Sequence, residues 1–199
     1  MPFTYFECLP AELPDDDSSR NALLGFPSWI NTQWQLDESR PVVGWNPQIF
    51  ATIHGTGPLT DLAAVLGTFH AMSARLVQLL ESIGCADIQL LPFRIRTVFG
   101  GELPHQYALA NYLTMLDAVD LRAAQLDGAT PVRDPATGAI VNLRSLALCA
   151  EMLGDARIFR LRGASDRVIY RSDVIRRIEQ SELTGFAFAP VPVSRCDGF

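Results

Sequence analysis

Two widely separated stretches of this sequence have the same order of features. The first runs from Ser73 to Pro92 and the second from Ser172 to Pro190. Each begins with a serine, continues with apolar residues at helical spacing, turns, and ends as a short apolar run that reaches a proline. Two helix–strand units of this kind favour an α+β fold with mixed or antiparallel sheets, few helices and two related helix–strand lobes.

The serines and prolines predict where these helices and strands begin and end. A serine hydroxyl can accept from the free N–H groups of a first helical turn, so we expect Ser73 and Ser172 to cap their helices. Proline has no N–H to donate to a sheet, so we expect Pro92 and Pro190 to end their strands. Over residues 93–98 apolar residues alternate with arginines, which predicts a further strand.

Other segments carry weaker patterns. Alternation and aromatic content predict strands over residues 3–8, 107–116 and 157–162. A turn with proline in its second position predicts a hairpin that pairs residues 131–133 with residues within 140–148. The apolar run that follows Pro58 favours a short helix ending near Leu66.

The length of 199 residues suits a single domain. We find no secretory leader and no apolar run long enough to span a bilayer, and therefore expect a cytoplasmic protein without membrane contact. The four cysteines are scattered, so we expect small buried side chains, with an exposed thiol at Cys196. The three histidines have no metal-ligand spacing, and we expect neither a metal nor a cofactor.

The charge is unevenly distributed along the chain. The formal net charge is −6, and an acidic run at residues 15–17 supplies much of the excess. Phosphate binding needs a basic face, so the charge argues against a nucleic-acid partner and permits a basic protein partner. All 16 basic residues are arginine, which excludes a Schiff-base lysine and a P-loop lysine.

Two sets of side chains leave a small hydrolase open as an alternative. Cys85 with His70 and Asp87 could form a thiol triad, although Cys85 follows a predicted helix C-terminus, where the helix dipole disfavours a thiolate. Asp117 and Asp120 could act as paired carboxylates if they shared a face. Capping and turn roles explain the same residues without chemistry, and we expect no catalytic residues.

The segment 157–177 holds seven arginines against two aspartates. Alternation places Arg160 and Arg162 on one strand face, where they could bind an acidic groove or phosphates. Salt bridges to the acidic N-terminal half of the chain are the simpler interpretation.

Three segments near the C-terminus resemble a known family. They read IFRLRG over 158–163, VIYRS over 168–172 and IEQSELTGFAFAP over 178–190. In order and spacing they are similar to immunity-protein family 11 of bacterial polymorphic-toxin systems. Further similarity is carried by residues 73–81, 90–95 and 107–121.

The resemblance implies a non-catalytic inhibitor that binds and neutralises the toxin domain of a contact-dependent or type VI effector in the cytoplasm. It covers residues 70–192 as a family-like core and leaves residues 1–69 as a variable part. We expect a basic toxin and a monomeric or homodimeric inhibitor. The predicted contact residues are acidic or aromatic and all lie in that variable part: Asp15, Asp16, Asp17, Trp29, Trp34 and Trp45.

Overall fold

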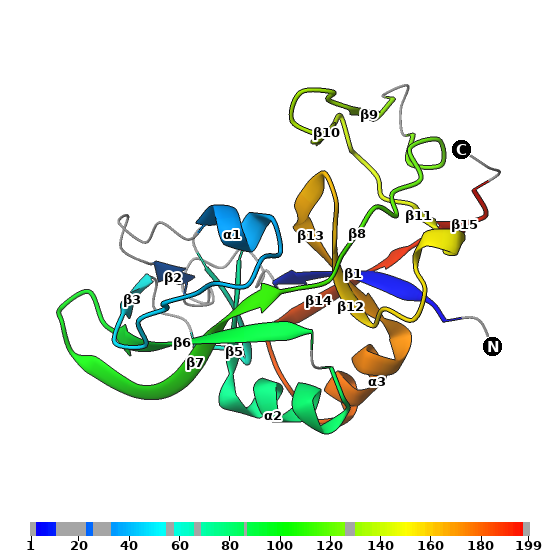
Figure 1. Cartoon of the computed structure of the whole chain (residues 1–199). Helices are drawn as coiled ribbons and strands as arrows, with labels where there is room; N and C mark the ends of the chain where they lie inside the picture. The colour runs from blue at the N-terminus through cyan, green and yellow to red at the C-terminus, as the bar shows by residue number, and fades with distance from the viewer. Residues whose placement is uncertain are drawn as a thin grey trace.

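The computed structural model describes residues 3–10, 23–25, 33–54, 58–65, 69–85, 87–125 and 130–196. Two large sheets and three α-helices account for most of its regular structure (Figure 1). The predicted α+β class, with mixed and antiparallel sheets and few helices, is confirmed.

The larger sheet has six strands, antiparallel except for the parallel pair β3 and β6. In spatial order its strands are β2 (Leu23–Gly25), β3 (Phe50–His54), β6 (Ile88–Arg96), β7 (Glu102–Tyr112), β5 (His70–Ser73) and β4 (Leu62–Ala64).

The second sheet has five strands, antiparallel except for the parallel pair β12 and β8. Its order is β14 (Phe186–Val191), β1 (Tyr5–Pro10), β13 (Ala164–Arg171), β12 (Ile158–Leu161) and β8 (Met115–Leu116). Two short pairs stand apart: β9 (Val132–Arg133) with β10 (Ile140–Val141), and β11 (Leu148–Cys149) with β15 (Val193–Ser194). The helices are α1 (Gln33–Asp37), α2 (Ala74–Ser82), α3 (Ser172–Gln180) and the 3-10 turn η1 (Ala150–Met152).

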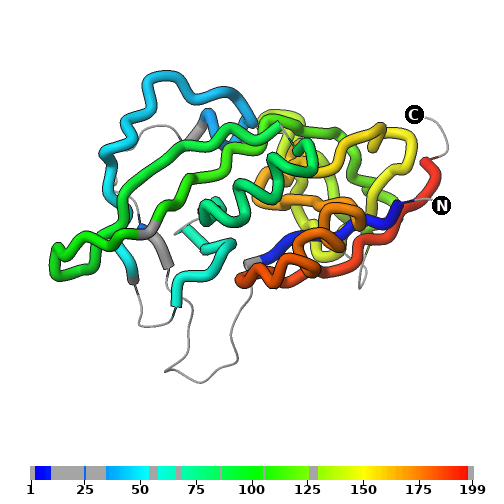
Figure 2. Tube along the Cα trace, turned by 90° about the horizontal axis from the view of Figure 1, so that it is seen from below, coloured from blue at the N-terminus to red at the C-terminus, as the bar shows by residue number. Residues whose placement is uncertain are grey.

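The two repeated units have the same topology. β5, α2 and β6 form one strand–helix–strand unit, and β7 lies between its strands, antiparallel to both. β13, α3 and β14 form the other, and β1 lies between its strands in the same way. The helices α2 and α3 lie side by side (Figures 1 and 2). Leu76, Leu80, Val174 and Ile178 from the two helices share one apolar core, so each unit covers the other's helix.

The ends of these units differ from the predictions in two ways. Ser73 caps α2 by accepting from the Leu76 N–H at 3.3 Å, as predicted. Ser172 is instead the first residue of α3, and its hydroxyl accepts from the Thr4 N–H at 3.4 Å. The prediction that Ser172 caps its helix is therefore wrong. The helix α3 begins at the serine itself, whereas α2 begins one residue after its serine.

Both prolines lie inside strands, so the prediction that they end them is also wrong. Pro190 tolerates its place because β14 is an edge strand. The carbonyl of Pro92 accepts from Trp45 Nε1 and not from a strand. The nitrogen and the carbonyl of one strand residue point to the same edge. The nitrogen of Pro92 therefore also faces Trp45, and its missing N–H interrupts no hydrogen bond between strands.

Most other element predictions are confirmed: β1, β7, β12 and the β9–β10 hairpin lie within or overlap their predicted ranges. The predicted helix before Leu66 is wrong, since Leu62–Ala64 forms strand β4. The Leu62 N–H donates to the Thr184 carbonyl at 3.1 Å, which attaches this segment to the turn that precedes β14. A short buried apolar run does not distinguish helix from strand by periodicity, and this tertiary bond favours the strand.

Candidate functional site

The residues predicted to contact a partner are only partly visible. Asp15, Asp16, Asp17 and Trp29 lie outside the described residues. The backbone of Trp34 belongs to α1, but its side chain is outside the described set. Trp45 is therefore the single member of the set whose side chain can be placed.

Trp45 belongs to a segment, residues 38–49, that lies along β6; we call it the strap. The Trp45 side chain is half-buried against the core of the six-stranded sheet, and its Nε1 donates to the Pro92 carbonyl at 2.6 Å. The Arg94 N–H donates to the Ile49 carbonyl at 2.8 Å further along. The geometry thus gives Trp45 an anchoring role on β6, while a partner contact for it stays a prediction.

Polar side chains fix the rest of the strap. The amide of Gln89 pairs with the main chain of Val42 in both directions, at 2.7 Å and 2.9 Å. Buried Asn111 donates from Nδ2 to the Arg40 carbonyl at 2.7 Å and to Gln89 Oε1 at 3.0 Å. These four hydrogen bonds join residues Arg40 and Val42 to β6 and β7, so the strap is held against the sheet, although Asn111 Oδ1 has no hydrogen-bond partner among the described residues.

Beyond the strap, β6 and β7 continue as a projecting hairpin, residues 93–106, which we call the arm (Figures 1 and 2). β5 pairs with β7 only over Tyr107–Leu109, so it does not reach the arm. A register shift between Phe93 and Ile95 marks a bulge, and Pro104 lies opposite it, where a missing N–H is tolerated. On the other side, β3 braces β6 through Phe50–Thr52.

The tip of the arm, residues Thr97–Gly101, is a tight hydrogen-bonded turn. The Thr97 N–H donates to the Gly101 carbonyl at 2.8 Å, and the Gly100 N–H to the Thr97 carbonyl at 3.0 Å. Gly100 has a φ of +86°, which its lack of a Cβ permits. This turn presents Val98 and Phe99 to solvent, with 61% and 95% of their surface exposed.

The side of the arm carries a compact charged cluster. The guanidinium groups of Arg94 and Arg96 lie 4.8 Å and 5.6 Å from the centre of the Phe50 ring. Arg94 Nε also donates to Glu102 Oε1 at 2.6 Å, across the base of the tip. Glu102 matches one of the two arginines, and Arg96 donates to the Thr52 hydroxyl, so the arm keeps one positive charge in excess.

The predicted arginine face on β12 is wrong. Arg160 is 2% exposed, whereas Arg162 is exposed beyond the end of the strand. Arg160 Nη1 donates to the Leu36 carbonyl of α1, and the guanidinium lies 5.7 Å from the Phe69 ring. Burial lowers the pKa of Arg160. Alternation on β12 did not reveal that both faces of this strand are covered.

Other arginines of the same segment are paired, but of those that follow only Arg167 pairs with the N-terminal half, as the salt-bridge interpretation predicts. Arg157 and Arg171 both bind Asp173, at 2.9 Å and 2.7 Å, and Arg167 binds buried Glu7 at 2.5 Å. Burial alone would raise the pKa of Asp173, but its bonds to the two arginines hold that pKa below its ordinary value.

Two residues of the hypothetical thiol triad, Cys85 and His70, pack in the interior of the fold. Cys85 packs against the core shared by α2 and α3, and burial raises its pKa, so the thiolate is disfavoured. The His70 ring is buried, and its Nδ1 lies 3.0 Å from the hydroxyl of Tyr112. Burial lowers the pKa of His70 to about 4. A neutral, buried imidazole bonded to Tyr112 does not activate Cys85.

The two aspartates also act separately. Asp117 accepts from Arg133 Nη2 at 2.5 Å. Asp120 accepts from the N–H groups of Arg122 and Ala123, both at 3.0 Å, and from the hydroxyl of Ser194. The Ser194 hydrogen bond is the main cause of the lowered pKa of Asp120. These are turn and tethering roles and not an acid–base pair.

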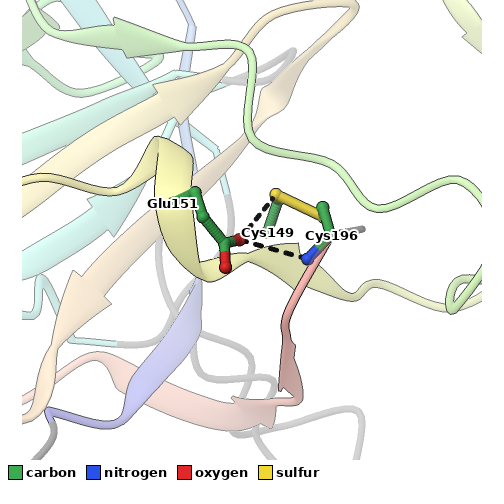
Figure 3. Close-up of side chains that lie close together, drawn as sticks. All are labelled: Cys149, Glu151 and Cys196. Carbon is green, nitrogen blue, oxygen red and sulfur yellow. Dashed lines mark hydrogen bonds between the residues drawn. A yellow bond between two sulfur atoms is a disulfide. The ribbon is translucent and has the colours of Figure 1, made fainter. Parts of the chain in front are cut away.

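Sequence reasoning missed one cluster, formed by Cys149, Glu151 and Cys196 (Figure 3). The two cysteines form a disulfide across 47 residues, with Cα atoms 5.5 Å apart, so the predicted free thiol at Cys196 is wrong. Glu151 Oε2 lies 3.3 Å from Cys149 Sγ and accepts from the Cys196 N–H at 3.1 Å. Each sulfur is bonded to the other and so is not a metal ligand in this state.

No spacing in the sequence signals this pair. It forms because β15 lies parallel to β11, which carries the last residues of the chain back to Cys149. Parallel pairing of two-residue strands leaves no local pattern that could be found in advance.

Helices long and apolar enough to cross a bilayer do not occur in the described part of the chain. Comparison with curated proteins gave no match. A family model matches residues 17–193, which includes the strap, the arm and both repeated units; its description is Immunity protein family (Imm11). The match begins well before residue 70, so it also includes the three tryptophans. The chain therefore belongs to the Imm11 family of immunity proteins.

Proposed function

We propose that this protein binds the toxic domain of one cognate bacterial effector in the cytoplasm and blocks it without catalysis. The observation that carries the proposal is the family match, which spans most of the chain. Membership in an immunity protein family suggests a toxin-neutralising role and an inhibitor that is not an enzyme.

The described side chains support an inhibitor. The candidate nucleophile Cys85 is disfavoured as a thiolate, and Asp117 and Asp120 are bound to different structural partners. The strap and arm instead offer a preformed surface, which a tight inhibitor needs because binding then orders few groups.

Charge supports a basic partner. A net charge of −6 attracts a cationic toxin and raises the association rate toward the steered limit of about 10⁸–10⁹ M⁻¹s⁻¹ at low salt. We include Asp15, Asp16 and Asp17 in this steering surface. Changing all three to asparagine is expected to lower the association rate several-fold at low salt and hardly at all at high salt.

The direct test is co-expression with the C-terminal domain of the effector encoded in the adjacent reading frame. We expect the full chain to restore growth and to co-purify with that domain as a stable complex. A matched control co-expresses an effector domain from an unrelated system, which should not be neutralised. Toxicity that persists despite folded, abundant protein, with no complex at micromolar concentrations, would refute the proposal.

A further inference from the structure

We propose that the tip of the arm inserts Phe99 and Val98 into an apolar recess of the cognate toxin domain, and that Phe99 is the principal anchor of the complex. The inference rests on the proposed function, since it names the surface by which this protein would hold its toxin.

The exposure of the tip has no explanation among the residues that the structure describes. A 95% exposed phenylalanine next to a 61% exposed valine gains nothing from the protein's own core. Single exposed apolar residues are common, but turns favour glycine, asparagine, aspartate and serine, which solvate well. Val98 and Phe99 occupy such turn positions, where polar residues would cost no folding energy.

The tip is also held in place before any partner arrives. Hydrogen bonds join Thr97 to Gly100 and Gly101, the latter also through the Thr97 hydroxyl at 3.2 Å. Strand β3 supports the arm from one side. An aromatic side chain on a rigid support loses little conformational entropy on binding, so its burial contributes strongly to affinity.

The shape and charge of the arm define its partner. The arm projects from the body, so it fits a concave surface and not a flat one (Figure 2). Arg94 is paired with Glu102, whereas exposed Arg96 donates to the Thr52 hydroxyl, so a single positive charge lies beside the apolar tip. The partner site is therefore an apolar recess on the toxin domain, and the acidic net charge of the chain supplies the steering.

This division of roles makes a kinetic prediction. Phe99→Ala should weaken binding of the adjacent-frame toxin domain by about 30-fold or more, through faster dissociation, because anchor residues act on the lifetime of a complex. The association rate and its salt dependence should be unchanged. Val98→Ala should have a smaller effect in the same direction, and Phe99→Trp should retain most of the affinity.

The matched control is Val132→Ala, which removes an apolar side chain that is 48% exposed on the separate β9–β10 hairpin. Association and dissociation rates of all variants are measured on immobilised toxin domain, and their stability by thermal unfolding. The tip variants should unfold at the same temperature as the wild type.

Each outcome has a distinct meaning. If the wild type does not bind the toxin domain, the proposed function fails and this inference fails with it. A second outcome is a wild type that binds and neutralises the toxin while the dissociation rate of Phe99→Ala stays within two-fold of the wild-type rate. In that case only the inference is overturned. A wild-type dimer that Phe99→Ala converts to monomer would assign the tip to a second copy of this chain and would also overturn it.

Discussion

At the scale of single residues, Gly185 is the most constrained position of the second repeated unit. Its φ is +93°, and a Cβ placed there would lie 2.3 Å from the Leu62 carbonyl oxygen. Gly185→Ala should therefore lower the free energy of unfolding by about 2–3 kcal/mol, measured by urea denaturation. Gly84 is the control: its φ is +74° but no atom lies within 4 Å of its added Cβ.

Gly84→Ala should lower the free energy of unfolding by only about 1 kcal/mol, the cost of a Cβ on a left-handed backbone. Equal losses in the two variants would show that contact with the Leu62 carbonyl is not what constrains Gly185.

His70 predicts a pH dependence of stability. Burial lowers the pKa of its imidazole from 6.5 to about 4, so the unfolded chain binds the proton more tightly than the folded one. Its contribution is complete above pH 6.5 and is lost as the pH falls from 6.5 toward 4, up to about 3 kcal/mol. In His70→Gln, urea midpoints at pH 7 and pH 4.5 should differ less than in the wild type. An unchanged difference would assign the acid sensitivity to other groups.

At the scale of elements, the two repeated helices end differently. After α2, Gly84 takes the left-handed conformation, and the Cys85 N–H donates to the Leu80 carbonyl at 2.9 Å in a Schellman arrangement. After α3 the same conformation is taken by exposed Glu182, with a φ of +51°. The second unit therefore carries backbone strain that the first does not.

Glu182→Gly should relieve that strain and raise the free energy of unfolding by about 0.5 kcal/mol. Asn142→Gly is the control, since Asn142 has a φ of +61° and asparagine tolerates this conformation. Chemical denaturation of both variants checks the prediction, which fails if Glu182→Gly is neutral or destabilising.

Elements were predictable where a local pattern decided them. Alternation fixed the inward residues of β6, because Leu91, Phe93 and Ile95 pack on one face. The β4 segment and the fully covered β12 were not predictable in this way, since their surroundings come from distant parts of the chain. The same limit applies to the site: Gln89 and Asn111 hold the strap through main-chain atoms of Val42 and Arg40, which no sequence pattern specifies.

At the scale of the whole molecule, the Cys149–Cys196 disulfide ties the C-terminal strand to the body. Closing a loop of this length restricts the unfolded chain and should stabilise the fold by about 4 kcal/mol in the chain-entropy description. Reduction with dithiothreitol should lower the unfolding midpoint accordingly. The double variant Cys149→Ser, Cys196→Ser should match the reduced protein, and Cys85→Ser serves as the control.

The proposed location adds a second measurement. Reducing compartments keep most thiols free. Rapid alkylation in intact cells should therefore label Cys149 and Cys196 if the protein works in the cytoplasm, whereas protection of both would place it in an oxidising compartment.

The position of β1 between β13 and β14 has a consequence for synthesis. The strand β1 pairs with Ile169–Arg171 and Phe186–Val191, which are synthesised more than 150 residues after it. Its edges stay unpaired while the intervening chain is translated, and such long-range pairing is slow. The five-stranded sheet closes only after Val191 has left the ribosome, so a nascent chain shorter than this lacks the sheet.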